Sequence, residues 1–430
     1  MAGPLVRYFL ERPGAKVKVA DIEVEKARAL VGSHPRGEAL VLNLKTEEGL
    51  KKEIAASDIV VSLVPYEYHP LVAKICIGLR KNMVTASYVD EALKALDADA
   101  RRAGIVILNE VGLDPGIDHM EAMRIIREVK SRGGKILGLT SYCGGLPAPE
   151  AKTNPFGYKF SWSPRGVLLA GKNAARYLMN GKEVHVSAGD LFGHPALVPV
   201  KGLGDFEGYP NRNSLPYIEL YGITETRTMF RGTLRYPGWC ETMKKIGELG
   251  LLDQTEKEMK GLTCSAFIGG LIGEMGDKGL KKALSEKLNL EPDSKVIERL
   301  EWLGLLSRER LPLERGSALD ILQALMLAKL CYEKGERDMI VLRHEFLIAD
   351  AGGKRQKIIS TLIDFGIPGG YSSMARTVGL PAAAGTRLVL EGRIGLTGVL
   401  IPVHPEIYEP ILEELEGQGL VFTEEKEDVD

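Results

Sequence analysis

Along the first 120 residues, short runs of β-branched and apolar residues alternate with segments whose apolar residues recur at helical spacing. A short apolar run is typical of a buried strand, and a helical period with charges on the opposite face is typical of a covering helix. The alternation therefore predicts a doubly wound α/β domain, in which helices cover a parallel sheet. The expected strands are Lys16 to Ile22, Ala39 to Leu44, Asp58 to Val64, Met83 to Ser87 and Ile105 to Asn109.

The pattern changes beyond this segment. A helix from Ile117 to Lys130 and a strand from Lys135 to Tyr142 precede a long Gly- and Pro-rich region, which predicts a mixed α/β second domain. Residues 241–335 are rich in Leu, Lys and Glu, so we expect a helical domain there. A strand pair is expected between Asp338 and Ile363, and the acidic end from Glu424 to Asp430 is expected to be a solvated tail.

The composition is that of an ordinary globular protein. Of 430 residues, 44% are apolar and 27% are charged, which excludes a disordered or low-complexity chain. Because 56 Lys and Arg stand against 58 Asp and Glu, the net charge of -2 creates no global field that would attract nucleic acid or an anionic membrane. Any charged ligand must therefore be bound by local groups.

The five cysteines are spread along the chain without a Cys-x-x-Cys pair. This spacing fits neither a disulfide framework nor a zinc site, so we expect no metal and a reducing, cytoplasmic environment. The uncharged stretch from Gly261 to Gly273 is shorter than the roughly 20 apolar residues that a membrane helix needs, so no membrane span is expected. The first residues lack the pattern of a signal peptide and are expected to be helical.

A dinucleotide-binding, or Rossmann, domain opens with a strand and a Gly-x-Gly-x-x-Gly/Ala loop whose N–H groups meet the pyrophosphate. We expect the first strand and the first two glycines to be missing here, with Ala2 or Gly3 at the third position of the loop. Asp21 ends the first expected strand, which would then be the second of the domain. Its carboxylate would either bind the ribose 2′-hydroxyl, which favours NAD over NADP, or cap the next helix.

Ligands of doubly wound sheets bind at the carboxyl ends of the strands. Three expected strand ends carry polar residues, in the segments Ser62 to Pro65, Thr85 to Tyr88 and Asn109 to Gly116. These segments are therefore candidates for a binding site.

Arg212, Arg231 and Arg235 lie in Gly-, Pro- and Asn-rich segments rather than on charged helical faces. Bidentate arginine is the side chain best matched to carboxylates. We expect Arg212 and Arg235 to face an open cleft and to contribute little to the stability of the fold.

Long motifs in a fixed order carry a resemblance to a known family. They are NEVGLDPGIDHM from Asn109 to Met120, TASY from Thr85, SYCGGLPAPE from Ser141, NPFGYKFSWS from Asn154, RGVL from Arg165, YPNRNS from Tyr209, RGTLRY from Arg231 and GGYSSM from Gly369. With these motifs the chain resembles the saccharopine dehydrogenase (saccharopine reductase, L-glutamate-forming) family, over essentially its whole length.

The resemblance implies a Rossmann domain at 1–117 plus about 393–430, a mixed α/β substrate and dimerisation domain at 118–240 plus about 336–392, and an inserted helical domain at 241–335. It implies an oxidoreductase of lysine metabolism that uses NAD or NADP to interconvert saccharopine with glutamate and 2-aminoadipate 6-semialdehyde. A homodimer and a small amino-acid substrate are the partners that it implies.

The resemblance also implies site residues, which we name by their numbers in this chain. The expected substrate-binding residues are Ser87, Tyr88, Asp114, Arg212, Thr233 and Arg235. The expected cofactor-binding residues are Ala2, Asp21, Ser62, Val64, Thr85, Leu113, Cys143 and Gly144.

Asp114 is the expected catalytic residue, because an anion beside the reacting carbon would favour a cationic imine and so assist hydride transfer. A turn or capping aspartate is the alternative. Imine formation and hydrolysis also need proton transfers, for which Asp114, Tyr142, Lys159 and His119 are candidates. Asp118 fits the first turn of a helix better than a site.

Two rival functions stay open at this point. The first is a related dehydrogenase that reduces another amino-acid imine, such as the carboxynorspermidine type, although the SYCGGLP and YPNR motifs argue against it. The second is a catalytically silent binding or scaffold homologue, which the missing phosphate loop would favour.

Overall fold

The computed structural model describes residues 1–274 and 279–429, and the chain divides into two compact units. Unit 1 contains Met1–Lys135, Ala349–Lys354 and Leu362–Glu424; unit 2 contains Ile136–Ile348, Arg355–Thr361 and Glu425–Asp430. Residues 362–424 belong to unit 1 in this division. From the sequence, residues 362 to about 392 were expected in the second domain. The predicted domain bounds stay a prediction.

The strands of unit 1 are parallel and form two sheets. They are β1 (Val17–Asp21), β2 (Gly37–Val41), β3 (Ile59–Val61), β4 (Asn82–Val84), β5 (Val106–Leu108) and β16 (Gly398–Leu400). β1 pairs with β2, and the other four have the order β16-β5-β4-β3. Among the described residues, β1 pairs only with β2, and β3 pairs only with β4.

All five strands expected in the first 120 residues are present, and each is shorter than predicted. β3, β4 and β5 each end before the polar residues that follow them, at Val61, Val84 and Leu108. Backbone bonds continue the ladder by one residue, at Ser62, Thr85 and Asn109, and the strands end there. A strand period drawn from apolar residues alone does not detect this change.

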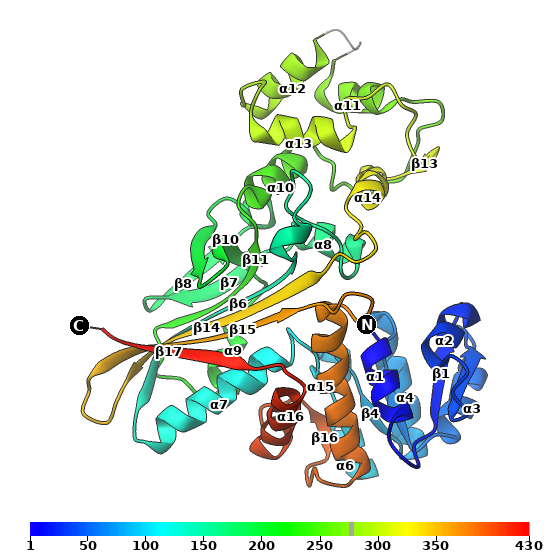
Figure 1. The fold of residues 1–430 in the computed structure, drawn as a ribbon, viewed down its shortest axis with the longest axis vertical. Helices are drawn as coiled ribbons and strands as arrows, with labels where there is room; N and C mark the ends of the chain where they lie inside the picture. The colour runs from blue at the N-terminus through cyan, green and yellow to red at the C-terminus, as the bar shows by residue number, and fades with distance from the viewer. Residues whose placement is uncertain (275–278, 430) are drawn as a thin grey trace. The chain divides into compact units, whose positions relative to one another are not determined.

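The helices of unit 1 cover these strands. They are α1 (Gly3–Leu10), α2 (Val24–Val31), α3 (Glu47–Ala55), α4 (His69–Leu79), α5 (Glu91–Lys94), α6 (Asp97–Ala103), α7 (Ile117–Ser131), α15 (Ser373–Leu390) and α16 (Pro405–Gly417), with a 3-10 turn at Tyr66–Tyr68. The first residues are helical, as expected from the sequence. α1 packs on α15, and α15 packs on α16 (Figure 1).

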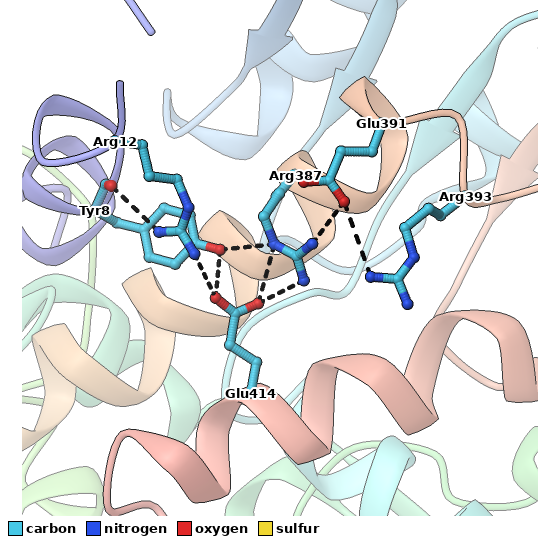
Figure 2. Close-up of polar contacts among 6 residues, drawn as sticks. All are labelled: Tyr8, Arg12, Arg387, Glu391, Arg393 and Glu414. Carbon is cyan, nitrogen blue, oxygen red and sulfur yellow. Dashed lines mark hydrogen bonds and ion pairs between the residues drawn. The ribbon is translucent and has the colours of Figure 1, made fainter. Parts of the chain in front are cut away.

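A cluster of charged side chains joins these three helices (Figure 2). Glu414 of α16 accepts hydrogen bonds from the Tyr8 hydroxyl, from Arg12 at 3.0 Å and from Arg387 at 2.9 Å. Arg12 also lies over the Tyr8 ring, 3.5 Å from its centroid. Burial, followed by the bond to Glu414, raises the pKa of Tyr8. Glu414 therefore links the first helix of the chain to its last two.

A nine-stranded sheet is the framework of unit 2. Its strands are β6 (Lys135–Pro147), β7 (Ala175–Met179), β8 (Lys182–Val186), β9 (Ala196–Val200), β10 (Gly204–Pro210), β11 (Thr228–Arg235), β14 (Asp338–Ala349), β15 (Arg355–Phe365) and β17 (Phe422–Asp428). Seven of them have the order β17-β15-β14-β6-β11-β10-β9, and β7 pairs with β11 and β8. The expected strand pair between Asp338 and Ile363 is confirmed as β14 and β15.

The acidic end is mostly exposed to solvent, as expected, but most of it is a strand and not a free tail. Residues 422–428 form β17, which pairs with β15 at the edge of the sheet. An edge strand keeps most of its side chains in solvent, so it tolerates this charge density. Lys201 pairs with Glu425 at 3.1 Å, which offsets part of that charge. Asp430 lies outside the described residues.

The helices of unit 2 lie mainly between residues 239 and 329, as expected. They are α8 (Pro164–Ala170), α9 (Pro216–Leu220), α10 (Trp239–Glu248), α11 (Cys264–Ile272), α12 (Leu280–Leu288), α13 (Lys295–Leu303) and α14 (Ala318–Lys329); short turns lie at Pro149–Ala151 and Ala188–Asp190, and β12 (Lys257–Glu258) pairs with β13 (Arg315–Gly316). α10 to α14 share one apolar core with Phe156, Tyr158 and Tyr209. Within the described part of the chain, no helix is long and apolar enough to cross a membrane.

We expect Glu414→Gln to lower the free energy of unfolding by about 2 kcal/mol, because it removes the negative charge that two arginines share in a largely buried place. Glu413→Gln is the matched control, since Glu413 is exposed on the same helix. Thermal unfolding of the two full-length variants measures the difference. Equal midpoints would show that the cluster does not stabilise the packing of these helices.

Candidate active site

The polar residues predicted for the site in unit 1 follow the carboxyl ends of its parallel strands. Ser62 and Val64 follow β3, Thr85, Ser87 and Tyr88 follow β4, and Leu113 and Asp114 follow β5. Backbone bonds hold these ends in line: Ser62 N donates to Val84 O, and Thr85 N donates to Leu108 O, each at 2.8 Å. The sheet geometry thus gathers these predicted residues at one edge.

The loop that carries Asp114 is closed by its own backbone. Gly112 N donates to Pro115 O at 3.0 Å, and Ile117 N donates to Gly112 O at 2.8 Å. Gly116 has a φ of 146°, and a Cβ there would lie 2.0 Å from Gly112 O, so this position requires glycine. Asp118 accepts from Gly116 N at 2.6 Å, which agrees with its expected place in the first turn of α7.

The structure brings two predicted substrate residues together. The Tyr88 hydroxyl donates to Asp114 Oδ1 at 2.7 Å. Because Tyr88 follows β4 and Asp114 follows β5, this bond joins two neighbouring strand ends. A phenol that donates to a carboxylate stabilises its anion. The pair can therefore present negative charge in a fixed place.

A second pair supports the same loop from the protein interior. Glu110 accepts from Val89 N at 2.9 Å with one carboxylate oxygen and bonds His119 Nε2 at 2.7 Å with the other. Both side chains are buried. This contact argues for a structural role of His119, one of the candidate bases, because its ring holds α7 to Glu110, whose other carboxylate oxygen accepts from Val89 N.

His69 is a polar residue of this edge that sequence reasoning missed. It is buried at the start of α4, with Nδ1 2.9 Å from Ser62 Oγ and Nε2 2.8 Å from Ser87 Oγ. Thr85 Oγ1 lies 3.4 Å from the same Nε2. The only signal in the sequence is a histidine that begins a helix just after a strand end, and many structural histidines share it.

In unit 2, a face of β11 carries three of the polar side chains considered above. Arg231, Thr233 and Arg235 alternate along the strand, so their side chains point to the same face. Cys143 of β6 pairs with Thr233 and therefore belongs to this face. From the sequence, Arg231 and Arg235 were expected in turn-rich segments. They lie in strand β11 instead, because its apolar residues Met229, Phe230 and Leu234 are buried on the two faces of the strand.

The expectation that Arg235 faces an open cleft was wrong. Only 4% of Arg235 is exposed, and its guanidinium lies over the rings of Tyr158 and Trp239, 4.9 and 5.6 Å from their centroids. Its NH1 donates to Leu234 O at 2.7 Å. Its Nε has no hydrogen-bond partner among the described residues. A buried cation of this kind is suited to an anionic ligand, because burial without a counter-charge is costly.

Arg212, by contrast, is exposed, and its backbone has a φ of 55°, in a loop that bonds β7 through Arg176 N. Gly144 of β6 was expected to allow close approach of a ligand. A Cβ at this position would lie 2.8 Å from Leu234 Cβ, so packing against the neighbouring strand alone already requires glycine.

Two candidate bases of unit 2 are engaged elsewhere. Tyr142 points to the face of the sheet opposite Cys143 and packs on Phe230, with ring centroids 5.3 Å apart. Burial raises the pKa of Tyr142 to about 12, so its phenol stays protonated at neutral pH. The buried Lys159 ammonium pairs with both carboxylate oxygens of Glu336 at 2.5 Å.

The remaining predicted cofactor residues lie at the start of unit 1. Ala2 precedes α1, and its carbonyl accepts from Val6 N at 2.9 Å. Asp21 ends β1 and accepts from Glu23 N at 2.9 Å, so one carboxylate oxygen caps the turn into α2. Because the N-cap position of α2 is Glu23, this bond closes the turn before the helix and does not cap the helix itself. Both roles considered for Asp21 therefore stay predictions. Residues 1–274 and 279–429 contain no cluster of three or more metal-ligating side chains.

Comparisons with known proteins identify the family of the chain. Residues 1–108 match the family model described as the saccharopine dehydrogenase NADP binding domain, and residues 112–420 match the saccharopine dehydrogenase C-terminal domain. The boundary between the two models falls in the turn before the Asp114 loop.

The chain is similar to two curated fungal proteins named saccharopine dehydrogenase [NADP(+), L-glutamate-forming]. It is 39% identical to that of Schizosaccharomyces pombe over 99% of this chain and 96% of the relative, and 40% identical to that of Saccharomyces cerevisiae over 99% and 97%. A solved structure of the apo Saccharomyces cerevisiae enzyme covers 99% of this chain and 97% of that chain, with a TM-score of 0.92 and 39% identity.

We expect the phenol of Tyr142 to ionise near pH 12, above the usual value of about 10, because burial disfavours the phenolate. Comparison of Tyr142→Phe with the wild type in an ultraviolet pH titration isolates this group. Tyr66→Phe, which removes a tyrosine that is 72% exposed, is the control for the loss of one phenol from the chain. A Tyr142 transition below pH 9 would restore this residue as a candidate base.

Proposed function

The chain belongs to the saccharopine dehydrogenase family, and we propose that it is an NADP-dependent oxidoreductase that interconverts saccharopine with L-glutamate and 2-aminoadipate 6-semialdehyde. The observation that carries this proposal is the match to the curated fungal enzymes at 39 to 40% identity over 99% of the chain. The Tyr88 and Asp114 pair and the buried Arg235 supply groups that suit such a substrate.

In the direction of saccharopine breakdown, the carbon of the C–N bond loses a hydride and becomes the carbon of a cationic imine. NADP⁺ supplies the hydride acceptor. Water then adds to the imine carbon, and the C–N bond breaks to give the amine of glutamate and the aldehyde. The protein must therefore stabilise a positive charge that develops on the substrate, and must move protons to and from water and nitrogen.

Asp114 is the residue to which we assign the first task. An anion beside the imine stabilises the positive charge more strongly in a water-poor place than in solvent. Because the anion is already in position, the protein need not reorganise during the reaction. The Tyr88 bond to Oδ1 fixes the direction of the carboxylate, and the closed loop from Gly112 to Gly116 fixes its backbone. Asp114 also stays the candidate for the proton transfers.

Arg212, Thr233 and Arg235 are assigned to the carboxylates of the substrate. Saccharopine carries three carboxylates, and a guanidinium binds such a group with two parallel hydrogen bonds. The surroundings of Arg235 favour this role, because the side chain is buried without an acidic partner among the described residues and its Nε has no hydrogen-bond partner there. A carboxylate would satisfy both its charge and this donor.

The carboxyl ends of the unit 1 strands fit a dinucleotide. Ile22 after β1 is 66% exposed, Leu63 after β3 is 40% exposed, and Tyr66 is 72% exposed. These exposed apolar side chains suit the rings of such a cofactor. The Ser62 and Thr85 side chains, by contrast, are buried and contact His69. We assign Ala2, Ser62, Val64, Thr85, Leu113, Cys143 and Gly144 to its binding, with a homodimer as the functional assembly. Asp21 is left out, because NADP carries a phosphate in place of the 2′-hydroxyl that this carboxylate would bind.

We expect the purified chain to oxidise saccharopine faster with NADP⁺ than with NAD⁺, as measured by the absorbance of the reduced cofactor at 340 nm. Asp114→Asn should lower kcat by a factor of about 100 to 1,000 while the KM for NADP⁺ stays within twofold, because the lost charge acts on the transition state. Asp58→Asn, which changes an exposed aspartate of the same unit, is the control. Turnover of another amino-acid imine with no turnover of saccharopine would contradict the proposal.

We expect Arg235→Met to keep or raise the melting temperature, because an apolar side chain of similar length removes the cost of a buried cation without leaving a large cavity. The same change should lower kcat/KM for saccharopine by a factor of about 30 to 1,000, the equivalent of about 2 to 4 kcal/mol. Arg212→Met is the exposed counterpart and should change the kinetics alone. A large fall in melting temperature for Arg235→Met would mark Arg235 as a structural residue.

A further inference from the structure

His69 contacts three residues that the sequence assigns to ligands. Its ring reaches Ser62 and Thr85, which are assigned to the cofactor, and Ser87, which is assigned to the substrate. These residues follow two neighbouring strands, β3 and β4, and the ring spans the gap between their ends. A histidine that only fills space does not need a hydroxyl on each ring nitrogen.

We propose that His69 is a positioning residue for the saccharopine reaction, which orients the Ser87 hydroxyl so that it accepts a hydrogen bond from the substrate. This inference rests on the proposed function. His69 acts through Ser87 and not by contact with the reacting atoms.

Hydrogen bonds already fix the backbone of Ser87, so the orientation of its hydroxyl is what remains to be set. Ser87 N donates to Thr85 Oγ1 at 3.2 Å, and Ser87 O accepts from Glu110 N at 3.1 Å. Rotation about the Cα–Cβ and Cβ–Oγ bonds remains. The contact of 2.8 Å with His69 Nε2 restrains both rotations.

The chemistry of a neutral imidazole decides what Ser87 offers to a ligand. One ring nitrogen donates and the other accepts, so a donor at Nδ1 toward Ser62 makes Nε2 an acceptor toward Ser87. The Ser87 hydroxyl then donates to His69, and its lone pairs face outward. The substrate nitrogen carries N–H groups and needs such an acceptor, so we assign the proton of His69 to Nδ1.

The surroundings of His69 support a neutral ring. Burial lowers its pKa, and this effect outweighs the attraction of Asp90 and Glu67, which acts in the opposite direction. Asp90 caps α5 through Leu93 N at 2.8 Å, and Glu67 lies in the turn just before α4. At neutral pH the ring therefore keeps one donor and one acceptor, as the assignment requires.

Two substitutions of different length separate the two contacts of the ring. The amide of His69→Asn can occupy the place of Nδ1 and reach Ser62, while that of His69→Gln can occupy the place of Nε2 and reach Ser87. We expect His69→Asn to lower kcat for saccharopine at least tenfold, His69→Gln to stay within threefold of the wild type, and the KM for NADP⁺ to stay within twofold in both.

A double-mutant cycle with Ser87→Ala tests whether His69 acts through Ser87. In the Ser87→Ala background, His69→Asn should cause less than a twofold further loss. His404→Asn, which changes an exposed histidine of unit 1, is the control and should match the wild type. If His69→Asn does not fold, the cycle is run with His69→Gln, whose small loss should likewise disappear.

The failure of this inference differs from the failure of the proposed function. A wild-type protein that does not oxidise saccharopine removes the proposed function and this inference with it. Three results with an active wild type would overturn the inference alone. They are equal losses of kcat in His69→Asn and His69→Gln, full additivity in the cycle, and an unchanged kcat in His69→Asn.

Discussion

The shared edge at which β3, β4 and β5 end is the constraint on which the candidate site of unit 1 depends. The carboxyl ends of parallel strands lie at the same edge of the sheet, so the sheet alone brings together residues that are far apart in the sequence. The ladder bonds from Ser62 N to Val84 O and from Thr85 N to Leu108 O carry this alignment one residue past each strand. Side chains then take over from the backbone. His69 joins the ends of β3 and β4, and the Tyr88 bond to Asp114 joins the ends of β4 and β5.

This edge shows why sequence reasoning reached the site residues more easily than the interactions that hold them. The alternation of apolar runs predicts the strands, and polar residues that follow each run predict the edge, because both signals are local. The contact between His69 and Ser87 joins residues on different elements, so no local pattern encodes it. Glu110 and His119 are nine residues apart, yet their contact depends on the turn between β5 and α7.

The errors in unit 2 have a different physical origin. Arg235 lies beside Gly232 and Pro237, and a segment with such neighbours resembles a loop by composition. The structure makes it the end of a buried strand, because Phe230 and Leu234 gain more from burial than the glycine costs. The acidic residues of β17 misled in the opposite direction. Charge density indicates exposure, and an edge strand meets that requirement without being disordered.

The two units thus treat buried polar groups in opposite ways. In unit 1 the hydroxyls of Ser62 and Ser87 find partners within the protein, so their geometry is set before any ligand arrives. In unit 2 the guanidinium of Arg235 lies over the rings of Tyr158 and Trp239, and its Nε has no hydrogen-bond partner among the described residues. Trp239 Nε1 likewise has no partner among them. An unsatisfied buried donor costs free energy that a bound acceptor restores. The proposed binding of a substrate carboxylate by Arg235 would therefore draw in part on the protein's own unsatisfied donors. The proposed ligand contacts of unit 1 would instead rely on groups that are already held in position.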